Sequence, residues 1–154
     1  PSWPISVISC DLNGLKLVND YLGHAAGDEV LTQGASLLRR CMRVSDCVAR
    51  VGGDEFVALL PHCSAIQAQR IMADIQRNIS ICNTDTSRIP VYLSLGSSTS
   101  EGDRTLQETI HEADRIMLEQ KVKTRVNSHH SIKRWIESHH HIEVSLTDSR
   151  NVGI

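Results

Sequence analysis

The hydrophobic and polar positions of this chain follow two periods, one typical of β-strands and one typical of α-helices. An apolar, β-branched run over 5–12 predicts a buried strand. Apolar positions at helical spacing then predict a short helix over 14–22 and a longer one over 25–43. Two more apolar runs, 47–51 and 55–61, flank a Gly-Gly pair and predict a β-hairpin.

The second half of the chain adds a helix, a strand and another helix. Ser64 with Gln67 and Thr105 with Glu108 have the spacing of capping boxes, which predicts a helix start at each. The run 90–98 between these helices predicts a strand. The order β-α-α-β-β-α-β-α indicates an α+β fold with a ferredoxin-like split βαβ core, in which helices flank an antiparallel or mixed sheet.

Polarity changes near residue 127. The segment 128–154 is polar and rich in histidine, with only Ile132, Trp135 and Ile136 as a weak helical stripe. We interpret 1–127 as the folded domain and 128–154 as a linker helix and tail. Its histidines are expected on a solvated surface rather than at a metal.

Composition excludes several classes of protein. A chain of 154 residues favours one domain that can bury its own core. A net charge of −2 and only five aromatic residues (two Trp, two Tyr and one Phe) argue against nucleic-acid binding. No apolar run approaches the roughly 20 residues of a membrane span. Five cysteines without a C-x-x-C pair predict free thiols and a cytoplasmic location.

The hairpin carries two adjacent acids at its tip. We expect Gly52 and Gly53 to have the positive φ angles of a primed turn and to let a bulky ligand approach. Strand alternation would place Asp54 and Glu55 on opposite faces. If the first strand lies beside the hairpin, Asp11 ends near these acids.

Converging carboxylates repel one another, and a divalent cation would relieve that repulsion. Mg²⁺ commonly binds one or two carboxylates together with phosphate oxygens. The sequence therefore suggests a metal-bound nucleotide at the hairpin tip. A solvated acidic turn is the alternative for the hairpin motif alone.

Asn19 and Asp28 suggest recognition of guanine. A carboxylate accepts hydrogen bonds from N1–H and the exocyclic amine of guanine, whereas adenine presents an acceptor at N1. Lys16 would contact phosphate as a point charge. Alone, Asn19 and Asp28 are equally compatible with turn and cap positions. The segment 11–31 does not fit a calcium loop, because its glycine falls at position four instead of six.

Together these features resemble the GGDEF family of diguanylate cyclases, which make cyclic di-GMP from two GTP. The resemblance covers 5–121 and is carried by "DLNGLKLVNDYLGHAAGD", "RVSD", "RVGGDEF", "LSLG" and "EADRIMLEQK". The segments "NGLK" and "MLEQKV" resemble those of the GGDEF subgroup that precedes HD-GYP domains.

The resemblance implies a role for each matching residue. Mg²⁺ (or Mn²⁺) would be held by the side chains of Asp11 and Asp54 and by the carbonyl of Leu12. Glu55 would lie near the metal and the reacting hydroxyl, and 52–53 would leave room for the α-phosphate.

The substrate contacts implied by the resemblance lie elsewhere in the chain. Asn19 and Asp28 match the guanine-binding residues, and Lys16 and Lys121 match phosphate-binding lysines. In the implied reaction, each GTP 3′-hydroxyl attacks the α-phosphate of the other and pyrophosphate leaves. Because one domain binds one GTP, catalysis would need a homodimer.

"RVSD" matches an inhibitory site for the product. Arg43 would contact phosphate or guanine, and Asp46 would accept from guanine N–H groups. The alternative is a solvated helix end with an arginine near the helix C-terminus.

The chain also departs from the family pattern. Asn13 stands where many members have aspartate, and Leu118 replaces a common tyrosine. Thr124 and Val126 replace residues of a G-R-N segment, which puts a phosphate contact by Arg125 in doubt. Two alternatives to an active cyclase therefore stay open: a module that binds GTP or cyclic di-GMP and regulates an attached domain, and an interaction domain with exposed acids.

Overall fold

The computed structural model describes residues 3–146. Its helices and strands follow the predicted order, which is thereby confirmed. In chain order they are β1 (Ile5–Leu12), α1 (Leu15–Leu22), α2 (His24–Arg39), β2 (Cys47–Arg50), β3 (Glu55–Pro61), α3 (Ala65–Cys82), β4 (Leu93–Ser100) and α4 (Leu106–His140).

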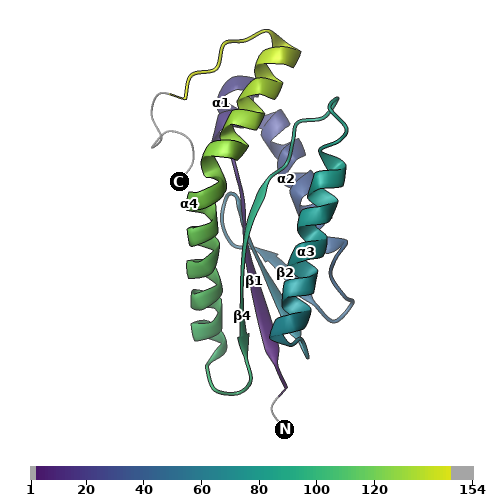
Figure 1. Cartoon of the computed structure of the whole chain (residues 1–154), viewed down its shortest axis with the longest axis vertical. Coiled ribbons are helices and arrows are strands. Elements are labelled where there is room, and N and C mark those ends of the chain that lie inside the picture. Colours follow the sequence, from purple (N-terminus) through teal and green to yellow (C-terminus); the bar gives the residue numbers. More distant parts are fainter. Residues whose placement is uncertain (1–2, 147–154) are drawn as a thin grey trace.

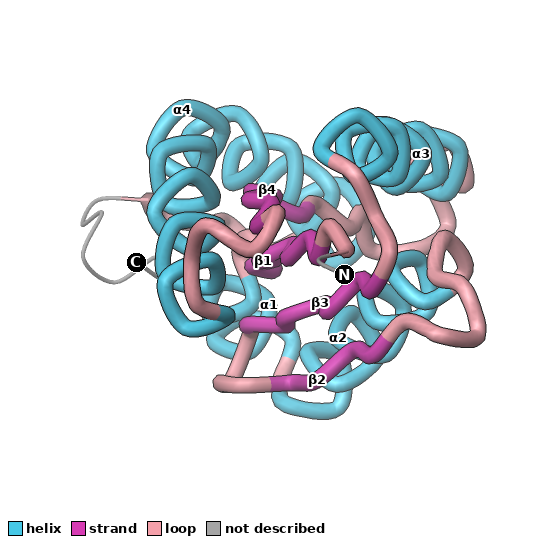
Figure 2. The backbone as a smooth tube through the Cα atoms, turned by 90° about the horizontal axis from the view of Figure 1, so that it is seen from below, coloured by secondary structure: helices cyan, strands magenta, loops and turns pink. Residues whose placement is uncertain are grey.

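The strands form a sheet in the order β2-β3-β1-β4, and every neighbouring pair is antiparallel. This confirms the predicted α+β, ferredoxin-like fold and decides for an antiparallel over a mixed sheet. Figure 2 shows α4 on one side of the sheet and α2 and α3 on the other. In Figure 1, α4 runs alongside β4, and it packs mainly on β4 and β1.

The two central strands differ in burial because helices cover them differently. Every residue of β1 after Ile5 is buried, as expected for a strand with helices on both faces. In β3, buried and half-buried residues alternate from Glu55 to Pro61. One face of β3 is therefore open, and that face carries Glu55.

Both predicted capping boxes are confirmed. At the start of α3, the Gln67 N–H donates to Ser64 Oγ (3.2 Å) and the Ser64 N–H donates to Gln67 Oε1 (2.8 Å). At the start of α4, Thr105 and Glu108 make the same reciprocal pair at 3.1 Å each. These side chains bind N–H groups that have no partner inside the helix.

The last helix is longer than the sequence suggested. α4 continues without a break across residue 127, the predicted domain boundary. Ile132 and Ile136 belong to the hydrophobic core. The expectation of solvated histidines is wrong for His129, which is 4% exposed because it packs beneath the loop between β1 and α1. Residues 147–154 of the predicted tail lie outside the described residues.

The cysteines and the helix lengths can be compared with the expectations from composition. All five cysteines are free thiols. None of the helices described has the length and apolar character needed to cross a lipid bilayer.

Candidate active site

The end of β1 lies against the tip of the β2–β3 hairpin. Asp11 is paired with Glu55 across the sheet, and the Leu12 N–H donates to the carbonyl of Asp54 at 2.8 Å. The antiparallel register thus brings Asp11 to the adjacent acids Asp54 and Glu55 at one corner of the sheet, although more than 40 residues separate it from them in the chain. This is the arrangement that the proposed metal site requires.

Asp11 is the most buried of these acids. One carboxylate oxygen, Oδ2, forms an ion pair with Lys121 of α4, and the other, Oδ1, has no hydrogen-bond partner within residues 3–146. Burial raises the pKa of Asp11 to about 6; the hydrogen bond from Lys121 opposes this, and the charges of Asp54 and Glu55 add to it. A buried carboxylate with an unsatisfied oxygen fits a cation ligand.

A fourth acid joins the site from α4. Asp114 accepts a hydrogen bond from Ser9 Oγ at 3.3 Å. The pKa of Glu55 is raised, first by burial and then by the charges of Asp114 and Asp54. The sequence reasoning did not assign Asp114 a role, although Asp114 precedes Lys121 by two helical turns and so shares its face.

These acids are neighbours, but their side chains do not form a complete set of metal ligands. Among residues 3–146, no group of three His, Cys, Asp or Glu side chains is arranged to hold a metal ion. The charge is instead neutralised in part by Lys121, which the resemblance assigned to phosphate. The chemistry fits a divalent cation, whose remaining ligands would come from the backbone and a bound phosphate.

The expected turn geometry of the hairpin is wrong. Neither Gly52 nor Gly53 has a positive φ angle. The connection is a four-residue loop over 51–54, so it does not need the two-residue primed turn. Arg50 holds it by donating to the carbonyls of Gly52 (3.1 Å) and Gly53 (2.7 Å). A Cβ at Gly53 would meet no atom of the described residues within 4 Å, which leaves open space beside Asp54.

The predicted guanine-binding residues lie next to each other on α1 and α2. The side-chain carboxamide of Asn19 rests on Gly27, where any Cβ would overlap it. Asp28 follows directly and is exposed. Lys16 is also exposed and pairs with Asp20 of its own helix at 2.9 Å.

Arg43 and Asp46 form a local pair in the turn before β2. The guanidinium donates to Asp46 Oδ1 at 2.9 Å and to the carbonyl of Pro61 at 2.6 Å. The Asp46 side chain is fully buried, whereas that of Arg43 is 43% exposed. Hydrogen bonding to Asp46 raises the pKa of Arg43. The pair therefore closes this turn whether or not it also binds a ligand.

A comparison with models of protein families identifies the family of this chain. A family model described as "Diguanylate cyclase, GGDEF domain" matches residues 2–127. The chain belongs to the GGDEF family.

Known GGDEF proteins resemble this chain over most of its length. Diguanylate cyclase A of Treponema denticola is 32% identical over 124 residues, which cover 79% of this chain and 33% of that protein. Diguanylate cyclase TpbB of Pseudomonas aeruginosa is 39% identical over 127 residues, which cover 79% of this chain and 29% of that protein. This chain thus spans a third or less of the length of these relatives.

Solved structures agree with the GGDEF fold. The active GGEEF domain of a diguanylate cyclase from Vibrio cholerae matches with a TM-score of 0.72 at 29% identity, over 80% of each chain.

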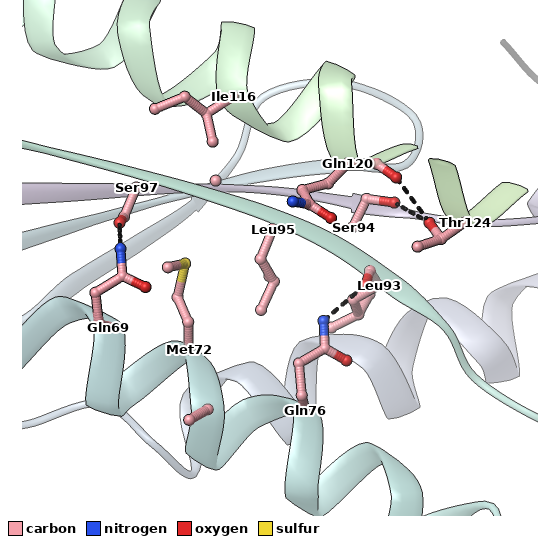
Figure 3. Close-up of a pocket in the computed structure, with 12 residues that line it drawn as sticks. Gln69, Met72, Gln76, Leu93, Ser94, Leu95, Ser97, Ile116, Gln120 and Thr124 are labelled. Atoms are coloured by element: carbon pink, nitrogen blue, oxygen red, sulfur yellow. Dashed lines mark hydrogen bonds between the residues drawn. The ribbon is translucent and has the colours of Figure 1, made fainter. Parts of the chain in front are cut away.

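The GGDEF chain also has a groove at the free edge of β4, between α3 and α4 (Figure 3). Its volume is about 420 Å³, and its lining contains no charged side chain. Gln76 donates to the carbonyl of Leu93, and Gln69 donates to Ser97 Oγ. Because no lysine or arginine lines this groove, it is unsuited to binding a triphosphate. The acidic corner of the sheet is therefore the better candidate for the nucleotide site.

Proposed function

We propose that this GGDEF chain is a diguanylate cyclase, which condenses two GTP molecules into cyclic di-GMP and two pyrophosphates. The observation that carries the proposal is the meeting of Asp11 and Asp54 at one corner of the sheet, where Oδ1 of the buried Asp11 has no hydrogen-bond partner among the described residues. An acidic turn in solvent would not need Asp11 to be buried among other acids.

Asp11, Asp54 and the carbonyl of Leu12 would hold Mg²⁺ or Mn²⁺. When bound, the metal would activate the 3′-hydroxyl and stabilise charge on the α-phosphate. Lys121, released from Asp11, would then neutralise phosphate oxygens, as would Lys16 from α1. Glu55 would lie near the reacting hydroxyl.

The remaining contacts would orient the nucleotide. Asn19 and Asp28 would bind the guanine edge, and the open space beside Gly53 would admit the α-phosphate. Correct positioning of the attacking oxygen and the phosphate accounts for much of such catalysis. Since each chain offers one such site, two chains would face each other about a two-fold axis.

We further propose that Arg43 and Asp46 bind the product and inhibit the enzyme. The exposed guanidinium of Arg43 would turn from Asp46 to phosphate or guanine, and Asp46 would accept from guanine N–H groups. An Arg43→Ala variant should lose product inhibition but keep its initial rate.

A second candidate is a binding module that regulates an attached domain without turnover. The ion pair between Lys121 and Asp11 favours it, because it occupies both groups that substrate and metal would need. Calorimetry with GTP and Mg²⁺ would separate the candidates, since a pure receptor binds nucleotide and leaves it intact.

The test of the cyclase is product formation by the dimeric protein. Incubation with GTP and Mg²⁺ should yield cyclic di-GMP, measured by chromatography. Asp54→Ala should lower the rate by about 100-fold or more, since it removes several kcal/mol of metal-based stabilisation. Asp74→Ala is the matched control, because Asp74 of α3 has a half-exposed side chain, which pairs with Arg77 of the same helix. No product from a dimeric sample would contradict the proposal.

A further inference from the structure

The part of α4 beyond residue 127, where the family match ends, contacts the loop between β1 and α1. This loop follows Asp11 and Leu12 and leads into α1 at Gly14. The same helix therefore contacts the candidate site at two places. Lys121 pairs with Asp11, and His129 and Ile132, two to three turns further along α4, lie against Gly14.

Gly14 is fixed by both its backbone and its neighbours. Its φ angle is +78°, a left-handed conformation that favours glycine. A Cβ built on Gly14 would lie 2.5 Å from Ile132 Cδ1 and 3.3 Å from His129 Cδ2. The loop backbone thus packs directly against these two side chains.

The side chain of His129 contributes packing, but no charge, to the contact with the loop. It is 4% exposed, and its Nε2 has no hydrogen-bond partner among the described residues. Burial, together with the charges of Arg125, Lys121 and His130, lowers its pKa to about 4. The imidazole is therefore neutral at pH 7 and adds no charge beside the loop.

This end of α4 is itself held by the rest of the molecule. Ile132 and Ile136 are buried in the core, and the Trp135 indole N–H donates to the carbonyl of Thr86 at 2.8 Å. Glu137 accepts from the Val144 N–H at 3.1 Å. A displacement of α4 would consequently be transmitted to Gly14 instead of being absorbed by a loose helix end.

We propose that His129 and Ile132 are positioning residues, which hold the β1–α1 loop in the conformation that places the Leu12 carbonyl and the first turn of α1 for metal and triphosphate. The part that concerns catalysis rests on the proposed function.

The experiment compares two single-methyl deletions in the full chain. Ile132→Val removes Cδ1, the atom that lies against Gly14. Ile136→Val removes the equivalent atom one turn along the same helix, where the side chain is also fully buried but is not among the nearest neighbours of Gly14. Both variants should lower the unfolding temperature by a similar amount. A difference between them in the measurements below therefore cannot come from a general loss of stability.

The first measurement is hydrogen exchange of the ligand-free protein by NMR. The Val18 N–H donates to the carbonyl of Gly14 at 3.1 Å and so reports on the loop. Its exchange should accelerate about fivefold more in Ile132→Val than in Ile136→Val. Equal exchange in the two variants would overturn the proposal, whatever the chain does with GTP.

The second measurement is the steady-state kinetics of cyclic di-GMP formation. Ile132→Val should raise the KM for GTP about fivefold at low Mg²⁺ and leave kcat within twofold, whereas Ile136→Val should change neither. Equal KM values would show that the loop position does not affect binding and would overturn the catalytic part. Absence of product from the parent protein would instead contradict the proposed function, while the exchange result still decides on the contact.

Discussion

The pKa and the charge balance of Asp11 depend on the residues around it. It is buried at the end of β1 and faces two other acids. Among residues 3–146, Lys121 pairs with one of its carboxylate oxygens, and the other has no hydrogen-bond partner. Breaking a buried ion pair costs more than the pair itself contributes, because it leaves a charge without a partner. Asp11 and Lys121 therefore offer tests that do not depend on turnover.

Lys121→Met should lower the free energy of unfolding by about 3 kcal/mol at pH 7, because it keeps the volume of the side chain and leaves Asp11 uncompensated. Urea denaturation with and without Mg²⁺ measures this, and the metal should restore part of the loss. Lys123→Met is the control, since Lys123 is exposed on the same helix. A similar loss in both variants would count against the importance of the pair.

Metal binding should weaken as the pH falls. Asp11 must be ionised to bind a cation, and its pKa in the folded protein is raised to about 6. Between pH 7 and pH 5 the affinity for Mn²⁺, measured by calorimetry, should fall by about tenfold, because the carboxylate fraction falls by that factor. A constant affinity over this range would exclude Asp11 as a ligand that titrates near pH 6.

At the scale of elements, the site depends on how closely α4 packs on the sheet. Gly96 of β4 lies directly beneath the backbone of α4, and a Cβ there would overlap the Met117 nitrogen and the Ala113 oxygen. Since main-chain atoms cannot move aside as a flexible side chain can, glycine is required at this crossing. This close approach brings Asp114 and Lys121 to the end of β1.

Gly96→Ala should therefore move α4 away from β4 and destabilise the fold by about 1–3 kcal/mol. Gly53→Ala is the matched control, because a Cβ at Gly53 meets nothing within 4 Å. Thermal unfolding compares the two. If Gly96→Ala were as stable as Gly53→Ala, the packing of α4 would not be set by this contact.

At the scale of the whole molecule, the C-terminal part of α4 is integrated into the fold. The predicted boundary at residue 127 falls inside a continuous helix, and among residues 128–146 three apolar residues are buried: Ile132, Ile136 and Val144. The family match ends at the same residue. A family match therefore does not define the unit that folds.

A chain ending at residue 127 should be far less stable than one ending at Leu146. Burial of each large apolar side chain contributes about 1.5–3 kcal/mol, so the loss of three amounts to about 5–9 kcal/mol, comparable to the whole stability of a small domain. Circular dichroism during heating measures the difference. Equal unfolding temperatures would support an independent domain over 1–127.

The sequence alone determined the order of elements and the type of fold. Local signals were sufficient, because period-2 and helical patterns reflect which side of each element faces the core. The capping boxes at Ser64 and Thr105 are equally local, since both partners lie within one turn. The motif around Asp54 was also specific enough to indicate the GGDEF family.

Tertiary structure decided what depends on residues far apart in sequence. Asp114, the buried His129 and the contact of Ile132 with Gly14 arise only when α4 folds back along β1, and no local pattern encodes that approach. The angles of Gly52 and Gly53 were misjudged because the length of the loop, set by strand register, determines the turn. Composition assigned the last part of the chain to the surface, but burial depends on which element a side chain meets.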